Sequence, residues 1–165
     1  MNRVCELTGA EFPLFAFSHC RDVVAAVTNA GGLGVLGAVA HTPEQLDIDL
    51  TWIEGEVKGR PYGVDLLVPE KFAGSESGGL DREALGELLP AGHRQWLEGL
   101  LDRYGIPPLP VGSATGGRSS GVGGMRVDPK SMAPLLDVLF AHETKLVASA
   151  LGPPPPHFIE RAHGA

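Results

Sequence analysis

Three places in the sequence combine polar side chains with apolar runs, and these are the residues that could do chemistry. Ser18 and His19 follow one apolar run. Asp65 lies inside a second run, and Ser149 lies inside a third. A carboxylate within an apolar run is destabilising unless it accepts hydrogen bonds or meets a ligand donor. Asp65 is therefore predicted to contact a ligand, and the alternative is a carboxylate satisfied by backbone N–H groups.

Histidine exchanges a proton near neutral pH, so His19 is the candidate catalytic residue, although a structural role in its loop is an equal alternative. Ser149 has a hydroxyl that could contact a ligand, but a structural role is the simpler interpretation. Five other histidines lie at expected helix ends or in loops, have no partner that the sequence identifies, and are expected at the surface: His41, His93, His142, His157 and His163.

Two glycine motifs match the letters of known signatures without their context. Residues 32–37 read G-x-G-x-x-G, but a helix is expected before the glycines and a strand after them, the reverse of a dinucleotide-binding turn. Residues 117–121 read G-x-S-x-G, but they lie in a glycine-rich loop and not at a strand-to-helix turn. Cys5 and Cys20 form no C-x-x-C pair and no cluster with metal-ligand spacing, so no metal site is predicted.

Alternating strands and helices must position these residues. Short apolar runs without alternation predict strands covered on both faces, and stripes at i, i+3, i+4 and i+7 predict helices. Ser18 is expected to cap the first helix, and Thr42, followed by Pro43 and Gln45, marks the start of the second. The strands are expected at 12–17, 33–39, 62–68 and 145–151. The helices are expected at 20–29, 42–59, 81–104 with a break at 90–92, 131–141 and 153–163.

The repeated strand–helix order predicts a parallel sheet with right-handed crossovers. Four such units are half of an eight-fold barrel, or a small open doubly wound sheet, and periodicity does not choose between them. The 165 residues fall short of the roughly 250 that a closed eight-stranded α/β barrel typically needs. Residues 69–130 are interpreted as an insertion within the domain 1–165, and their Gly-, Pro- and Ser-rich part, 105–126, is expected to be mobile.

Composition and charge exclude several classes of protein. Lys and Arg number 13 against 20 Asp and Glu, a net charge of −7 without a basic cluster, so no nucleic-acid partner is expected. The N-terminus has no apolar run typical of an export signal. The uncharged stretch 23–40 is broken by Thr28-Asn29 and Gly31-Gly32, so it predicts no membrane span. With two cysteines expected to be reduced, the sequence predicts a cytoplasmic protein.

Several runs of the sequence resemble the opening of the nitronate monooxygenases, a family also called 2-nitropropane dioxygenases. The most specific run is VVAAVTNAGGLGVLG at 23–37. Further similar runs are FPLFAF at 12–17, TPEQL at 42–46 and PYGVDLLVP at 61–69. KLVASALG at 145–152 resembles the fourth strand of the family.

The resemblance implies a TIM barrel that holds FMN at the C-terminal ends of its strands and oxidises alkyl nitronates with O₂ to carbonyl compounds and nitrite. The implied partners are a small nitronate substrate and O₂. In the family the backbone at the end of the first strand passes along the flavin, which implies Ala16, Phe17 and Ser18 here. An Asn at the end of the third strand usually contacts FMN, and Asp65 stands in its place. Ser149 completes the set of candidate cofactor-binding residues.

Two features depart from the pattern of the family. An ionised Asp65 cannot donate the hydrogen bond of an amide and would place a negative charge near the flavin. The Pro-Met-Ala-Gly-like turn after the first strand is replaced by FSHC at 17–20. Both changes suggest a divergent subfamily.

Members of the family are much longer, and their second half carries the phosphate-binding loops and the histidine segment that supplies the catalytic base. This sequence is therefore expected to be a truncated N-terminal half barrel. Unpaired edges at its first and fourth strands would favour self-association or pairing with the missing half. Three interpretations stay open: a nitronate monooxygenase-type flavoenzyme, a catalytically inert fragment, and a related flavin barrel such as an enoyl reductase.

Overall fold

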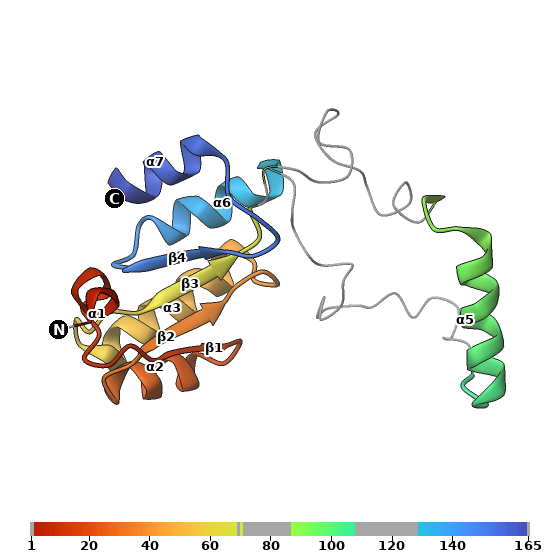
Figure 1. Ribbon diagram of the computed structural model, residues 1–165, viewed down its shortest axis with the longest axis horizontal. Coiled ribbons are helices and arrows are strands. Elements are labelled where there is room, and N and C mark those ends of the chain that lie inside the picture. The colour runs from red at the N-terminus through yellow and green to blue at the C-terminus, as the bar shows by residue number, and fades with distance from the viewer. Residues whose placement is uncertain (1, 69, 71–86, 108–128, 165) are drawn as a thin grey trace. The chain divides into compact units, whose positions relative to one another are not determined.

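Four parallel strands form the centre of the structure, in the order in which they occur along the chain. The computed structural model describes residues 2–68, 70, 87–107 and 129–164 (Figure 1). Each of the four predicted strands is present, with shorter bounds than expected. The strands are β1 (Phe15–Ser18), β2 (Leu33–Gly37), β3 (Gly63–Leu66) and β4 (Leu146–Ser149).

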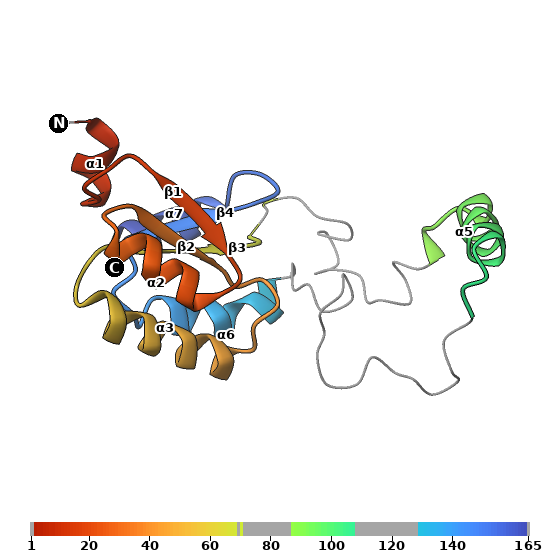
Figure 2. The ribbon, with the colours of Figure 1, turned by 90° about the horizontal axis from the view of Figure 1, so that it is seen from below.

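Helices connect the strands and cover one face of the sheet. Figure 2 shows α2, α3 and α6 on the same side of the sheet, and Phe158 of α7 is buried in the same core as these helices. The described helices of this part are α1 (Arg3–Thr8), α2 (Arg21–Asn29), α3 (Pro43–Val57), α6 (Pro129–Leu139) and α7 (Pro156–Gly164).

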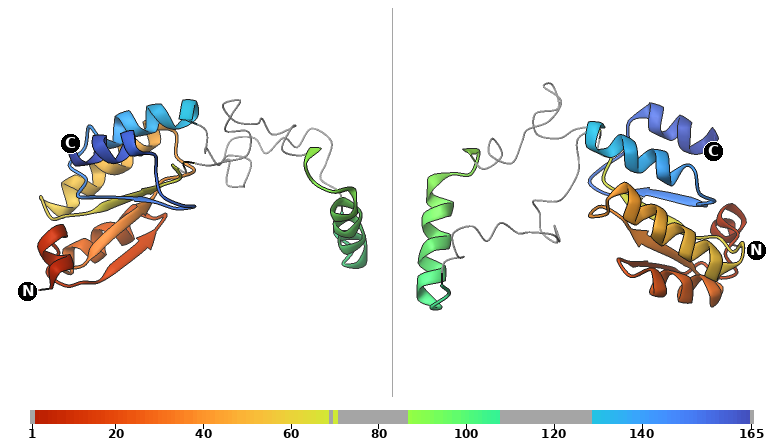
Figure 3. Two further views of the ribbon diagram at one scale, coloured as in Figure 1. Left: turned by 45° about the horizontal axis from the view of Figure 1, so that its top comes forward. Right: turned by 180° about the vertical axis from the view of Figure 1, so that it is seen from behind.

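The strand order and the helix placement decide between the two fold classes that the sequence left open. In a doubly wound sheet the strand order reverses and helices cover both faces, whereas in a barrel successive strands are neighbours and the helices lie outside. Here the order is β1-β2-β3-β4, with α2, α3 and α6 on one side of the sheet (Figure 3). The sheet therefore fits part of an α/β barrel. Within the described residues β1 and β4 are its two edges.

The clearest local prediction was the start of α3, and the structure confirms it. The Thr42 side chain accepts a hydrogen bond from the Gln45 N–H at 3.2 Å, and Pro43 occupies the first turn. This cap satisfies one of the N–H groups that a helix start leaves unpaired. The predicted stripe of α3 is buried in full: Leu46, Leu50, Ile53 and Val57.

The close packing of α2 on β2 explains the glycine motif at 32–37. A Cβ atom at Gly34 would overlap the backbone of Val24, so only glycine permits this approach. The Gly34 N–H donates to Thr28 Oγ1 at 3.2 Å. Helix α2 precedes this run, and residues 33–37 of the run form strand β2 itself, so the glycines do not form the strand-to-helix turn of a dinucleotide-binding motif.

The first strand and its connection differ from the prediction in two ways. β1 is not covered on both faces, because it is an edge strand, and Phe15 and Phe17 are 44 % and 57 % exposed. Ser18 does not cap α2, because the N-cap is Cys20, which makes no side-chain capping bond. The Ser18 hydroxyl accepts the Cys20 N–H at 3.0 Å and thereby shapes the turn before the helix.

Helix α1 was not predicted from the sequence, although its two end signals are present. The Asn2 side chain accepts the Val4 N–H at 2.9 Å, and Gly9 ends the helix with a φ of 78°. Cys5 on this helix is buried and Cys20 is exposed, and both are free thiols.

Helix α5 (Ala91–Arg103) belongs to a second unit, residues 73–124, and is described by itself. It confirms a helix over the second part of the predicted range 81–104, with Pro90 at the expected break. Residues 71–86 and 108–128 lie outside the described part, and with them most of the predicted insertion at 69–130, most of the loop 105–126 and the motif 117–121. No helix in the described part of the chain is long and apolar enough to span a bilayer.

Candidate functional site

The register of the sheet assigns the predicted site residues to its two faces. Gly37 pairs with Asp65, and Phe17 pairs with Val35, two residues before Gly37 on β2. Because side chains alternate along a strand and paired residues point the same way, Phe17 and Asp65 lie on the face opposite the helices. We call this the open face.

A histidine and a phenylalanine pack together at the C-terminal end of this face. His19 Nδ1 lies 2.9 Å from the carbonyl oxygen of Gly37. The rings of Phe17 and His19 meet edge to face, with centroids 5.0 Å apart. Gly37 makes the arrangement possible, since a Cβ there would lie 2.7 Å from the His19 ring. The structure thus brings together His19 from the β1–α2 connection and Phe17 from β1.

Asp65 lies at the same end of the open face and is only partly buried. Burial raises the pKa of its carboxyl above the ordinary aspartate value, and the nearby His19 lowers it in part. Among the described residues, no backbone N–H group and no side chain donates a hydrogen bond to the Asp65 carboxylate. The described residues therefore do not support the alternative prediction, in which backbone N–H groups donate hydrogen bonds to the Asp65 carboxylate.

The remaining predicted residues lie on the other face. Ser18 pairs with Leu36, and Ser149 pairs with Leu66, both of which belong to the helix-side core. The Ser149 hydroxyl lies 3.5 Å from the Ala150 carbonyl oxygen and 3.4 Å from that of Gly152, which is a local contact. Ala16, two residues before Ser18 on β1, shares its face, so the side chains of Ala16 and Ser18 do not lie on the open face.

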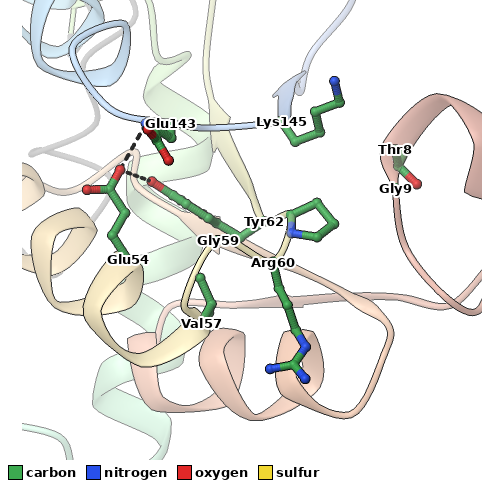
Figure 4. A pocket seen from close by; sticks show the side chains of 10 residues that line it. Thr8, Gly9, Glu54, Val57, Gly59, Arg60, Tyr62, Glu143 and Lys145 are labelled. Atoms are coloured by element: carbon green, nitrogen blue, oxygen red, sulfur yellow. Dashed lines mark hydrogen bonds between the residues drawn. The ribbon is translucent and has the colours of Figure 1, made fainter.

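A cavity of about 370 Å³ lies at the opposite, N-terminal end of the strands (Figure 4). It is lined by residues at the C-terminal ends of α1 and α3 and by residues before β3 and β4. Figure 4 shows the side chains of Arg60 and Lys145 directed away from the Glu54–Tyr62 pair, so its charged groups do not converge. In α/β barrels this end serves stability, and ligands bind at the other end.

A hydrogen-bond network stiffens this N-terminal end. Glu54 Oε1 accepts the Tyr62 hydroxyl at 3.0 Å and the Glu143 N–H at 2.9 Å. Burial raises the pKa of Glu54, but the hydrogen bonds from Glu143, His142 and Tyr62 outweigh it and hold the pKa below the ordinary value. Burial and the adjacent carboxylate of Glu54 raise the pKa of Tyr62 far above its usual range. The network ties α3 to the segments before β3 and β4.

Two histidines were predicted to be surface residues without partners, and for both this prediction is wrong. His142 lies between two carboxylates of α3, with Nε2 3.1 Å from Asp47 Oδ1 and Nδ1 3.1 Å from Glu54 Oε2. His41 Nε2 lies 3.0 Å from Asp49 Oδ2. These side chains are 9 % and 12 % exposed, because each closes a contact onto α3. The other three are exposed, as predicted: His93, His157 and His163.

No metal centre is formed within the described ranges, where no group of three or more His, Cys, Asp or Glu side chains could hold an ion. The site that the structure assembles therefore consists of Phe17, His19 and Asp65 on the open face, with Gly37 between them. Of these residues, Gly37 was not identified as part of the site from the sequence. The signal that could have found it is its place at the C-terminal end of β2, where a glycine leaves room for neighbouring rings.

Comparison with known proteins shows similarity along the chain. A family model described as nitronate monooxygenase matches residues 12–89. Rv1533 of Mycobacterium tuberculosis, provisionally named a monooxygenase, is 59 % identical over 161 residues, which are 98 % of this chain and 42 % of that protein. A Staphylococcus saprophyticus protein named "Probable nitronate monooxygenase" is 37 % identical over 71 residues, 41 % of this chain and 20 % of the relative.

A solved structure shares the fold. The nitroalkane oxidase from Streptomyces ansochromogenes superposes with a TM-score of 0.57 at 22 % identity, over 99 % of this chain and 40 % of that one. At this identity the likeness concerns the fold, which in that neighbour is a TIM barrel. The four-stranded sheet described above thus corresponds to part of a complete barrel.

The matches point to the same family, and the two that cover almost the whole chain each align it with less than half of a longer protein. The chain spans less than half the length of the M. tuberculosis relative and of the Streptomyces structure. The predicted resemblance to the nitronate monooxygenase family is confirmed, and the chain corresponds to the N-terminal part of the proteins that it resembles.

Proposed function

We propose that the chain forms the first part of an FMN-dependent oxidoreductase that uses O₂ to oxidise alkyl nitronates to carbonyl compounds and nitrite. The observation that carries the proposal is the open face: its polar residues gather at the C-terminal ends of barrel-type strands, where such folds bind ligands. The relatives named as nitronate monooxygenases support the reaction class.

The residues of the open face fit the ring system of a flavin. Phe17 presents an exposed aromatic ring, and Val35 next to it is apolar. Asp65 adds a polar group suited to the edge of a planar heterocycle. On the outer side of β1 the backbone has no strand partner among the described residues. Because Leu33 N–H donates to the Leu14 carbonyl oxygen, the ladder directs the main-chain groups of Ala16 and Ser18 toward β2 and leaves those of Phe15 and Phe17 facing outward. Ligand pockets typically combine an apolar lining with a few polar groups in this way.

Asp65 is the residue whose protonation decides how it meets the cofactor. As a carboxylate it only accepts hydrogen bonds, and as a carboxylic acid it also donates one. The raised pKa caused by burial favours the acid form, while His19 opposes it. When bound, FMN supplies the redox chemistry that carries electrons from the nitronate to O₂. The chain contributes apolar contact and orientation.

No Arg or Lys side chain among the described residues lies at the C-terminal end of the open face to bind the phosphate of the cofactor. Arg21, which follows β1, is bound to Asp49 at 2.9 Å and lies over the Trp52 ring at 4.7 Å on the helix side. The proposal therefore assigns the ring of FMN to this chain and its phosphate to other parts of the protein. Binding by the 165-residue chain alone should be weak and insensitive to the phosphate.

Titration with FMN and with riboflavin tests the flavin half of the proposal. Flavin fluorescence should change with similar dissociation constants for both ligands, because they share the ring and differ in the phosphate. A chain that changes neither signal would support the interpretation of an inert fragment. Tighter binding of FMN by tenfold or more would show a phosphate site within the chain and contradict the division proposed here.

Oxygen consumption tests the reaction. With flavin present, propyl-1-nitronate should be consumed with O₂ uptake and nitrite release in the absence of NAD(P)H, either by the chain or by a longer protein that contains it. Uptake that depends on NAD(P)H, with reduction of an activated alkene, would instead favour the enoyl reductase interpretation.

A further inference from the structure

His19 holds a distinctive place among the groups that can carry a positive charge. Two others follow the same strands: Arg21 after β1 and His41 after β2. Both are bound to Asp49, at 2.9 Å and 3.0 Å, on the helix side. On the described open face at the C-terminal end, His19 is left as the side chain that can be cationic.

The ring of His19 is oriented by its surroundings. Nδ1 faces the Gly37 carbonyl oxygen at 2.9 Å, and a carbonyl oxygen only accepts hydrogen bonds, so Nδ1 carries the proton of this bond. Phe17 packs against the ring edge to face, and the missing side chain at Gly37 leaves the space that the ring occupies. Nε2 is therefore the nitrogen available to a ligand, on a residue that is exposed.

We propose that His19 is the specificity-determining residue for the anionic group of the substrate, with Nε2 as the donor to a nitronate oxygen. This inference rests on the proposed function. A nitronate carries its negative charge on two oxygens bound to nitrogen, and a charged imidazole would both neutralise that charge and donate a short hydrogen bond. Gly37 and Phe17 are positioning residues, because they act by holding the ring.

The surrounding charges set the sign of the pH dependence. Asp65 on β3 faces the same space, and Asp22 in the first turn of α2 contacts Cys20 Sγ at 3.5 Å next to His19. Of these two, Asp65 interacts electrostatically with His19, so its carboxylate opposes an incoming anion there. Anion binding should therefore be strongest when the His19 ring is charged, and weaker at a higher pH at which the ring is neutral.

Nitrate is a suitable probe, because it is a stable planar anion with oxygens on nitrogen. The His19 ring resonances of the 165-residue chain are followed by NMR during nitrate titration at pH 6 and pH 8, without flavin. We expect the dissociation constant to rise about tenfold from pH 6 to pH 8, the size of one hydrogen bond to a charged partner.

Matched variants make the test specific. His19→Gln should bind nitrate with the weak pH 8 constant at both pH values. His19→Lys, which stays charged, should restore binding and remove the pH dependence between 6 and 8. Asp65→Asn should tighten nitrate binding severalfold at pH 8, because it removes a like charge. His163→Gln, at an exposed position on α7, should change nothing.

Two outcomes would overturn the inference. Nitrate could leave the His19 resonances unmoved, or His19→Gln could bind nitrate with the same constants and pH dependence as the unmodified chain. Because this test uses no flavin, its failure is separate from that of the proposed function. Flavin binding with nitronate oxidation and an unchanged His19→Gln variant would refute only the role of His19.

Discussion

Asp65 is the residue whose environment departs most from that of a surface carboxylate. It lies on a central strand, on the uncovered face, with a pKa raised by burial and held back by His19. The sequence alone identified Asp65, because a carboxylate inside an apolar run is destabilising unless it accepts hydrogen bonds or contacts a ligand. The sequence also identified Phe17 and His19, but their placement beside Gly37 and Asp65 follows from strand pairing, which the sequence does not show.

Asp65→Asn should tighten flavin binding by about threefold to tenfold. The amide donates a hydrogen bond at every pH and brings no negative charge, which is worth about a kcal/mol at such a site. Riboflavin titration at pH 7.5 measures the change. An unchanged dissociation constant would count against contact between Asp65 and the flavin.

Gly37→Ala should displace the His19 ring and destabilise the fold. The added Cβ would lie 2.5 Å from Phe17 and 2.7 Å from the His19 ring, an overpacking that typically costs about 1–3 kcal/mol. Urea denaturation and the His19 NMR signals report both effects. Gly55→Ala is the matched control, because a Cβ there meets nothing within 4 Å in helix α3, and it should stabilise by about 0.5–1 kcal/mol. Equal effects of the two substitutions would contradict the packing described at Gly37.

At the scale of elements, short sequence patterns correctly predicted those helices and strands that depend on capping and burial over a few residues. Thr42, Pro43 and Gln45 defined the start of α3, and the four apolar runs defined the strands, because capping and burial patterns act over a few residues. Helix α1 was missed although Asn2 and Gly9 bound it, since six residues carry too little periodicity.

Contacts far apart in sequence were the ones that sequence reasoning could not supply. His142 meets Asp47, which is 95 residues away, and a lone histidine gives no sign of such a partner. The exposure of Phe15 and Phe17 was also missed, because an apolar run reads as buried whether or not another strand covers it. The faces of Ser18 and Ser149 likewise followed only from the register.

The Glu54 network gives α3 a pH-dependent attachment to β3 and β4. The pKa of the Glu54 carboxyl is lowered in the folded state. The stabilisation that the ionised Glu54 gives the fold is therefore fully present above the ordinary pKa of 4.5 and is lost as pH falls through the lower folded-state pKa. Glu54→Gln should cost about 1–2 kcal/mol at pH 7 and show a weaker loss of stability between pH 5 and pH 3. Urea unfolding across this range measures both. Identical pH curves for the variant and the unmodified chain would show that Glu54 does not contribute.

At the scale of the whole molecule, the two edges of the sheet predict self-association. β1 carries exposed Phe15, and unpaired strand edges with apolar side chains promote pairing between chains. Sedimentation of the 165-residue chain should show species larger than a monomer at micromolar concentration. Phe15→Lys should shift them toward the monomer, whereas Ile48→Lys, on an exposed position of α3, should not. A chain that is monomeric at all concentrations would contradict this expectation.

Backbone NMR of the labelled chain during riboflavin titration tests the central claim most directly, because the two ends of the sheet give separate signals. We predict shifts concentrated at Phe17, His19, Gly37 and Asp65, the C-terminal end of the open face. Shifts confined to the cavity around Gly59, Tyr62 and Lys145, or no saturable shifts at all, would contradict the account.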